Sequence, residues 1–157
     1  MTHSNATRRT MEGTTRHPAQ PDEVFPLLCP VREREWLAGW DPTIAYSESG
    51  VAEPGCVFTT VGPEGALHVW TVSRHDRQAG IVEFVVVATG LYVMKLDIVL
   101  QPEAESTLAV WRRAFTALTP AGERAIAALD GGHHDRRIAH LEASINHYLR
   151  TGSMLRA

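Results

Sequence analysis

Strand-like segments separated by glycine and proline place the tightest constraint on how this sequence folds. The segments are 43–49, 56–61, 67–74, 81–88, 91–100 and 107–118. The breaks between them fall at Ser49-Gly50, Pro54-Gly55, Gly62-Pro63, Ala79-Gly80, Thr89-Gly90 and Pro102. Connections this short join antiparallel strands, because parallel neighbours need a crossover of a dozen or more residues. The pattern therefore predicts an antiparallel meander rather than a series of βαβ units.

The region before this meander predicts one further strand and two short helices. Its segments are 8–17 (a strand, ended by Pro18 and Pro21), 22–28 (a helix with Asp22 as N-cap and Pro26 inside it) and 31–37 (a helix between Pro30 and Gly39). Aspartate is a favourable N-cap, and proline is tolerated only in the first turn of a helix. The two helices are therefore expected to be short.

The C-terminal region predicts a long helix that packs on the sheet. A short helix over 123–129 is interrupted at Asp130-Gly131-Gly132, and a longer one follows over 134–150. Its apolar residues are Ile138, Leu141, Ile145, Tyr148 and Leu149, at a spacing that forms one helical face. At 1.5 Å per residue this helix is about 25 Å long. We expect an α+β domain in which a curved antiparallel sheet of six or seven strands wraps around this helix and leaves a cavity between them.

Chain length and charge limit the number of domains and the kinds of partner that this protein can have. With 157 residues the chain predicts a single domain over 9–152, flanked by tails at 1–8 and 153–157. A formal net charge of −3 argues against nucleic-acid binding. The apolar stretch 81–100 contains Glu83, Lys95 and Asp97, which argues against membrane insertion. Residues 1–9 lack the apolar core of a signal peptide. We expect a cytoplasmic monomer or homodimer, with Cys29 and Cys56 as buried reduced thiols.

Several motifs resemble the START-like helix-grip superfamily, also called SRPBCC. The motifs are 21–28 (PDEVFPLL), 29–40 (CPVREREWLAGW), Trp70-Thr71-Val72 with Arg74-His75-Asp76, 111–118 (WRRAFTAL) with Gly122, and 147–152 (HYLRTG), the last similar to an uncharacterised bacterial subgroup. The family includes polyketide cyclase/dehydrase-like proteins, lipid-transfer domains and plant pathogenesis-related ligand carriers. The resemblance covers about residues 10–152 and implies the helix-grip fold with a ligand cavity. It implies no single activity, because one fold hosts many functions.

Strand alternation selects the side chains expected to face the cavity. In 91–100, Tyr92 and Met94 share the inner face, and Lys95 and Asp97 lie on the outer face. In 107–118, Trp111, Arg113 and Phe115 share one face. A partly buried Arg113 between aromatic rings can clamp a carboxylate or an enolate oxygen. The alternative is that it extends to the rim or pairs with a structural carboxylate.

The expected strands 67–74 and 81–88 contribute further candidate site residues. His68 and Trp70 share a face, so an inward His68 can transfer protons, although an exposed or simply hydrogen-bonded histidine is the alternative. Glu83 is a general acid if it faces the cavity, or a solubilising group if it faces solvent. The residues expected to contact a ligand are Trp36, Trp40, His68, Trp70, Phe84, Tyr92, Met94, Trp111, Arg113 and Phe115.

Histidines near the C-terminus do not form a recognisable metal site. His133, His134, His140 and His147 do not match a known metal-ligand spacing, and no carboxylate or thiol completes a set. We interpret them as an exposed polar flank of the last helix. The sequence therefore predicts neither a metal nor a cofactor.

Three functions remain open at this stage. The first is binding of a small apolar or aromatic molecule between the sheet and the C-terminal helix. The second is a polyketide cyclase/dehydratase-like enzyme in which Arg113 stabilises an enolate and His68 or Glu83 moves protons. The third is a protein-interaction or stress-response module with an incidental cavity, for which an exposed patch at Trp36 and Trp40 would be evidence.

Overall fold

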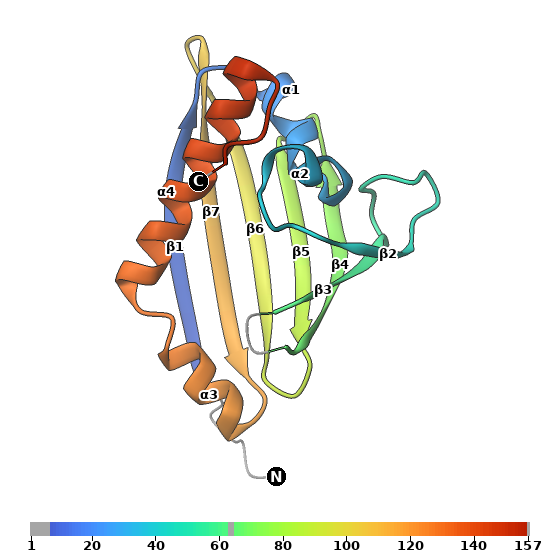
Figure 1. The fold of residues 1–157 in the computed structure, drawn as a ribbon, viewed down its shortest axis with the longest axis vertical. Helices are drawn as coiled ribbons and strands as arrows, with labels where there is room; N and C mark the ends of the chain where they lie inside the picture. The colour runs from blue at the N-terminus through green and yellow to red at the C-terminus, as the bar shows by residue number, and fades with distance from the viewer. Residues whose placement is uncertain (1–6, 63–64, 157) are drawn as a thin grey trace.

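A seven-stranded antiparallel sheet forms the body of the molecule (Figure 1). The computed structural model describes residues 7–62 and 65–156. The strands lie in the order β1-β7-β6-β5-β4-β3-β2, so all sequential neighbours from β2 to β7 are paired and β1 closes the far edge against β7. Their bounds are β1 (Arg8–His17), β2 (Thr43–Tyr46), β3 (Val57–Val61), β4 (Leu67–Asp76), β5 (Ile81–Ala88), β6 (Tyr92–Glu103) and β7 (Ser106–Ala117). The predicted meander is confirmed.

The helices lie on one face of this sheet (Figure 1). They are α1 (Pro21–Val24), the 3₁₀ turn η1 (Phe25–Leu28), α2 (Pro30–Trp36), α3 (Pro120–Ala127) and α4 (Gly131–Thr151). The long helix α4 packs against β1 and α2, and the predicted stripe from Ile138 to Leu149 faces the core. The Tyr148 hydroxyl donates a hydrogen bond of 2.8 Å to Glu35, which joins α4 to α2. The expected α+β layering is therefore observed.

Several boundaries differ from the sequence-based expectation: α3 and α4 each begin three residues earlier than expected, β2 ends at Tyr46, and the N-terminal region differs as follows. The helix expected over 22–28 is split into α1 and η1, because Pro26 lies within it. Its N-cap is Gln20 rather than Asp22, since Glu23 accepts the Gln20 N–H at 3.2 Å. Arg8 belongs to β1, whereas residues 1–6 of the expected N-terminal tail lie outside the described residues.

The alternation of β6 divides inner from outer side chains as predicted. Tyr92, Met94, Leu96, Ile98 and Leu100 are buried, and the residues between them are only partly buried. On the outer face, Lys95 binds Glu83 at 3.1 Å and also contacts Asp97. Glu83 is therefore not a cavity acid: its register opposite Asp97 places it in a cross-strand ion-pair cluster on the other side of the sheet.

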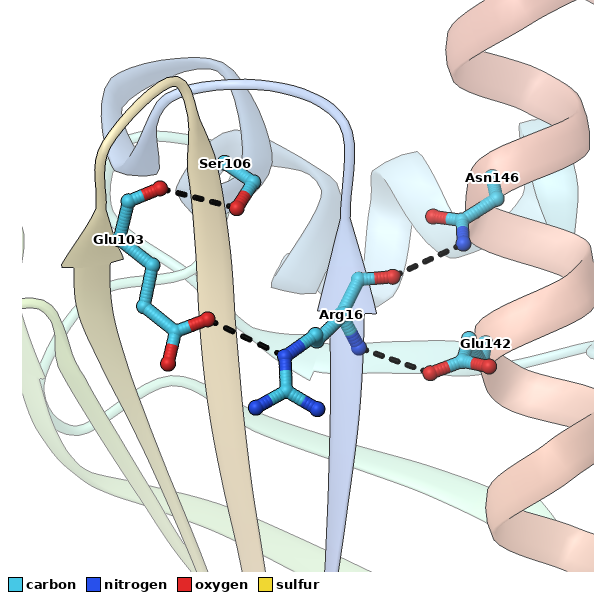
Figure 2. Close-up of polar contacts among 5 residues, drawn as sticks. All are labelled: Arg16, Glu103, Ser106, Glu142 and Asn146. Atoms are coloured by element: carbon cyan, nitrogen blue, oxygen red, sulfur yellow. Dashed lines mark hydrogen bonds and ion pairs between the residues drawn. The ribbon is translucent and has the colours of Figure 1, made fainter.

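Side chains of α4 satisfy the free edge of β1 (Figure 2). The Arg16 N–H donates to Glu142 at 2.7 Å, and the Arg16 carbonyl accepts from Asn146 at 2.9 Å. The Arg16 side chain donates to Glu103, at the β6–β7 turn, at 3.1 Å. An edge strand otherwise presents unpaired backbone groups, which invite pairing with another chain. These contacts therefore protect the edge and fix α4 along β1.

A buried hydrogen-bond network reinforces this attachment. The Trp111 indole N–H donates to Thr15 at 2.8 Å, and the Thr15 hydroxyl lies 2.7 Å from His17 Nε2. His17 Nδ1 lies 2.7 Å from the Asn146 side-chain oxygen, which can only accept, so Nδ1 carries the hydrogen. The Thr15 hydroxyl can donate to Nε2 of a neutral ring, and burial lowers the pKa of His17 below the ordinary value of 6.5, which favours the neutral form.

We expect the contribution of His17 to stability to depend on pH. A lowered folded-state pKa gives stability that is present above 6.5 and is lost as the pH falls through the folded-state value. Replacing His17 with Phe leaves buried partners unsatisfied and should lower the free energy of unfolding by about 1–3 kcal/mol at pH 8. This difference from the wild type should shrink at pH 5 in urea titrations.

The matched control is His140→Phe on the exposed side of α4, which should change the free energy of unfolding by less than about 0.5 kcal/mol. Burial also lowers the pKa of His75. This effect is the same in the wild type and in both variants, so it cancels when their free energies of unfolding are subtracted. A His17→Phe difference that is independent of pH would contradict the assignment of a neutral His17.

Gly13 allows α4 to approach β1 closely. A Cβ atom at this position would lie 2.7 Å from Ile138 Cγ1 and 3.0 Å from its Cδ1. Ile138 is β-branched and packs against the core, so it cannot easily rotate away. Glycine is therefore required for the observed helix–strand distance.

Gly13→Ala should destabilise the protein by about 1–3 kcal/mol, because the added methyl group overpacks this contact. In an Ile138→Ala background the same change should have almost no cost, because the opposing side chain is gone. A double-mutant cycle on free energies of unfolding measures this coupling. Additive effects of the two substitutions would show that the contact does not limit the packing.

Candidate functional site

Two adjoining compartments lie between the sheet and the helices. The inner compartment, lined by residues such as Phe58, Phe84 and Leu141, measures about 40 Å³, room for a few water molecules. The outer compartment extends toward α3 and measures about 370 Å³. Five residues line both: Trp40, Trp70, Met94, Arg113 and Arg137. The free space between the sheet and the helices therefore lies mainly at the α3 end.

Aromatic rings form the wall of the inner compartment. Phe58 and Trp70 stack with their ring centroids 5.3 Å apart, and Trp40 meets Trp70 edge-on at 5.6 Å. Each indole N–H has a hydrogen-bond acceptor: Trp40 donates to the Pro30 carbonyl at 2.9 Å and Trp70 to Thr60 at 3.0 Å. With their polar atoms satisfied, the rings present apolar surface to the cavity.

The outer compartment combines aromatic and titratable side chains. Tyr92 and Phe115 are in edge contact at 5.2 Å, and the His68 ring lies 6.2 Å from that of Tyr92. The β4 register places His68 on the same face as Trp70, where it lines this compartment. His133, from the first turn of α4, lies on its opposite wall.

Arg113 is held in a defined orientation by His134. Its Nη2 donates to His134 Nδ1 at 2.8 Å, and His134 Nε2 donates to the Glu12 carbonyl at 2.8 Å. Because a guanidinium has no acceptor, Nδ1 must be the acceptor and Nε2 carries the hydrogen. The Arg113 guanidinium also lies 5.5 Å from the Phe115 ring. His134 is therefore buried, contrary to the interpretation of these histidines as an exposed flank.

Arg137 and Glu33 bring two further charged groups to the inner compartment. Glu33 is half-buried and Arg137 is exposed, although both line this compartment. Burial raises the pKa of Glu33 to about 8, and the charge of Arg137 partly opposes this rise. Burial and the neighbouring Arg137 lower the pKa of Arg113 to about 10. Burial also lowers the pKa of Arg137.

Most of the predicted ligand-contacting residues line one or both compartments. They are Trp40, His68, Trp70, Phe84, Tyr92, Met94, Trp111, Arg113 and Phe115. Trp36 does not line either one. It is fully buried and donates from its indole to the Leu27 carbonyl at 2.8 Å, so it belongs to the core beneath α2.

Sequence reasoning missed Glu33 and Arg137, although their helical positions carry a signal. Arg137 follows His134 by three residues and precedes Leu141 by four, so all three share one face of α4. Glu33 stands in the same relation to Pro30 and Leu37 on α2. A charged residue on an otherwise inward helical face is the pattern that could have identified both.

The described part of the chain contains no group of three or more side chains that can hold a metal ion. His134 is engaged by Arg113 and Glu12, and His140 is exposed. Cys29 and Cys56 are buried and unbridged, as expected. No helix in the described ranges is long and apolar enough to cross a membrane.

Solved structures with the same architecture are similar to this chain at low sequence identity. Norcoclaurine synthase from Thalictrum flavum, in complex with dopamine and hydroxybenzaldehyde, has a TM-score of 0.68 at 12% identity, over 92% of this chain and 88% of that one. Ginseng major latex-like protein 151 from Panax ginseng has a TM-score of 0.67 at 13% identity, covering 90% and 97%. An uncharacterised protein from Rhizobium leguminosarum has a TM-score of 0.64 at 14% identity, covering 91% and 97%.

These similarities confirm the helix-grip fold that the sequence motifs implied. At these identities they establish the fold alone, because one fold supports many activities. No protein-family model and no curated protein sequence matches the chain.

Replacing the Glu33 carboxyl with an amide should stabilise the protein at alkaline pH. A raised carboxyl pKa gives a contribution that is fully present below 4.5 and is lost as the pH rises through about 8. Glu33→Gln abolishes this loss. At pH 9 it should raise the free energy of unfolding by roughly 2 kcal/mol, less than the full linkage value because the side chain keeps some solvent contact. At pH 4 the variant and the wild type should be nearly equal.

The control is Glu35→Gln on the outer side of α2, where hydrogen bonds from Arg32 and Tyr148 lower the pKa of the carboxyl. This variant should not become more stable than the wild type at pH 9. Urea titrations at pH 4 and pH 9 measure the free energies of unfolding of the wild type, Glu33→Gln and Glu35→Gln. A Glu33→Gln variant no more stable than the wild type at pH 9 would contradict the raised pKa of Glu33.

Proposed function

We propose that this protein binds a small aromatic or apolar molecule in the outer compartment, with the ligand reaching the aromatic wall at Trp40 and Trp70. The observation that carries this proposal is the 370 Å³ compartment lined by Tyr92, Phe115 and Trp70. Its volume lies within the range of small-molecule sites, and its lining is apolar with a few convergent polar groups. The inner compartment is too small for a ring and accommodates at most a small substituent.

A structural neighbour supports an aromatic ligand. Norcoclaurine synthase shares this fold, and its structure contains dopamine and hydroxybenzaldehyde. In this chain, flat ring surfaces at Trp70 and Tyr92 offer stacked or edge-on contacts, each worth about 0.5–1.5 kcal/mol beyond area burial.

Catalysis in the same compartment is the second candidate. Arg113 and His68 both line the outer compartment, as the cyclase-like hypothesis requires, whereas Glu83 lies on the opposite face of the sheet. A cyclase-like reaction would therefore use Arg113 to stabilise an enolate and His68 to move a proton, without Glu83. The interaction-module hypothesis loses its expected patch, because Trp36 is buried and Trp40 packs on Trp70.

The neutral fluorophore N-phenyl-1-naphthylamine tests the binding proposal. It should bind with an increase in fluorescence, because the compartment removes its ring from water. Ala128→Trp should weaken this binding at least tenfold, since Ala128 lines the outer compartment and an indole there occupies it. Ala127→Trp is the matched control: Ala127 and Ala128 are both exposed, but Ala127 lines neither compartment.

Circular dichroism should show both variants folded. Equal affinity of the Ala127→Trp and Ala128→Trp variants for the fluorophore would place its binding elsewhere and contradict the proposal. Failure of the wild-type protein to bind the fluorophore would also contradict the proposal.

A further inference from the structure

The boundary between the two compartments carries an unusual concentration of positive charge. Arg113 from β7 and Arg137 from α4 both line the inner and the outer compartment. The other residues that do so are Trp40, Trp70 and Met94. A ligand that reaches the aromatic wall from the outer compartment therefore passes both guanidinium-bearing side chains.

Neither arginine forms an ion pair with a carboxylate among residues 7–62 and 65–156, although Glu33 interacts with Arg137 at longer range. Arg113 donates to His134, a neutral acceptor, and its remaining donors have no carboxylate partner. Arg137 has neither a hydrogen bond nor an ion pair within the described ranges. Some neighbouring arginines do have carboxylate partners: Arg32 of α2 binds Glu35, and Arg112 of β7 binds Asp97.

Glu33 does not supply the missing negative charge at neutral pH. It is the one carboxyl among the described residues that line these compartments, and it forms no ion pair with Arg137. Its pKa of about 8 keeps it largely protonated at pH 7. The boundary therefore holds two guanidinium charges next to a largely neutral acid.

Burying a charge is unfavourable unless a counter-charge and hydrogen bonds compensate it. Arg113 is only 8% exposed, so its unpaired donors gain most from an anion that enters the cavity. A guanidinium is planar and matches the two oxygens of a carboxylate with parallel hydrogen bonds. The aromatic rings beside it provide surface for a ring attached to that carboxylate.

We propose that the ligand is an aromatic carboxylate, whose carboxylate binds at the boundary between Arg113 and Arg137 while its ring lies in the outer compartment against Trp70 and Tyr92. This inference rests on the proposed ligand-binding function and specifies the ligand class for that site. Arg113 and Arg137 are the residues that select the charge, and the aromatic wall selects the ring.

A pair of isosteric probes separates charge from shape: 2-naphthoate is anionic and 2-naphthamide is neutral. Isothermal titration calorimetry at pH 7 should show that the wild type binds 2-naphthoate at least tenfold more tightly than 2-naphthamide. Arg137→Gln should remove most of this preference and leave the affinity for 2-naphthamide within about twofold of the wild type. Arg136→Gln changes the same net charge on an exposed side chain that lines neither compartment, and it should retain the preference.

The outcomes distinguish this inference from the function on which it rests. Equal affinity of the wild type for the two naphthalenes, or loss of the preference in Arg136→Gln to the same extent as in Arg137→Gln, overturns the carboxylate assignment. Binding of N-phenyl-1-naphthylamine would in that case still support an aromatic site. If the wild type binds none of the three compounds, both the inference and the proposed function are wrong. Because Arg137 forms no hydrogen bond or ion pair with the described residues, its substitution tests ligand charge without removing the Arg113–His134 contact.

Discussion

The attachment of α4 to the edge strand β1 is the interaction on which the rest of the structure depends. Gly13 lets the helix approach, and Glu142 and Asn146 take up the free backbone groups of Arg16. With the helix held along β1, His134 in its first turn reaches Arg113 on the neighbouring strand β7. The same contact thus protects a sheet edge, sets the width of the cavity and positions the charged groups that line it.

The site combines an apolar interior with charges that do not favour folding. Tryptophan and phenylalanine rings with satisfied polar atoms form most of the wall. Arg113 is buried there, which lowers its pKa, whereas Glu33 is half-buried and Arg137 is exposed. In the proposal made above, an anionic ligand group would compensate the charge of Arg113. The orientation of Arg113 by His134 and Glu12 means that little side-chain freedom remains to be lost when a ligand binds.

The spacing of turn residues and the alternation of side chains along each strand were sufficient to predict the sheet and most of the cavity-facing side chains. Period-two alternation assigns Tyr92, Met94, Trp111 and Arg113 to the inner face, because a buried sheet face fixes the register. Glu33 and Arg137 were missed because the helical stripe was identified by its apolar members alone. The burial of His134 and the division of the cavity depend on how side chains fill the space between α4 and the sheet. That packing is a tertiary property which the sequence pattern does not contain.

A crystal structure of the protein with 2-naphthoate tests the account most directly. It should show the carboxylate oxygens about 3 Å from guanidinium nitrogens of both Arg113 and Arg137. The naphthalene ring should lie in the outer compartment beside Trp70 and Tyr92, with the Arg113–His134 bond retained. A ligand bound with its carboxylate directed to solvent, or one seated outside the two compartments, would contradict the account.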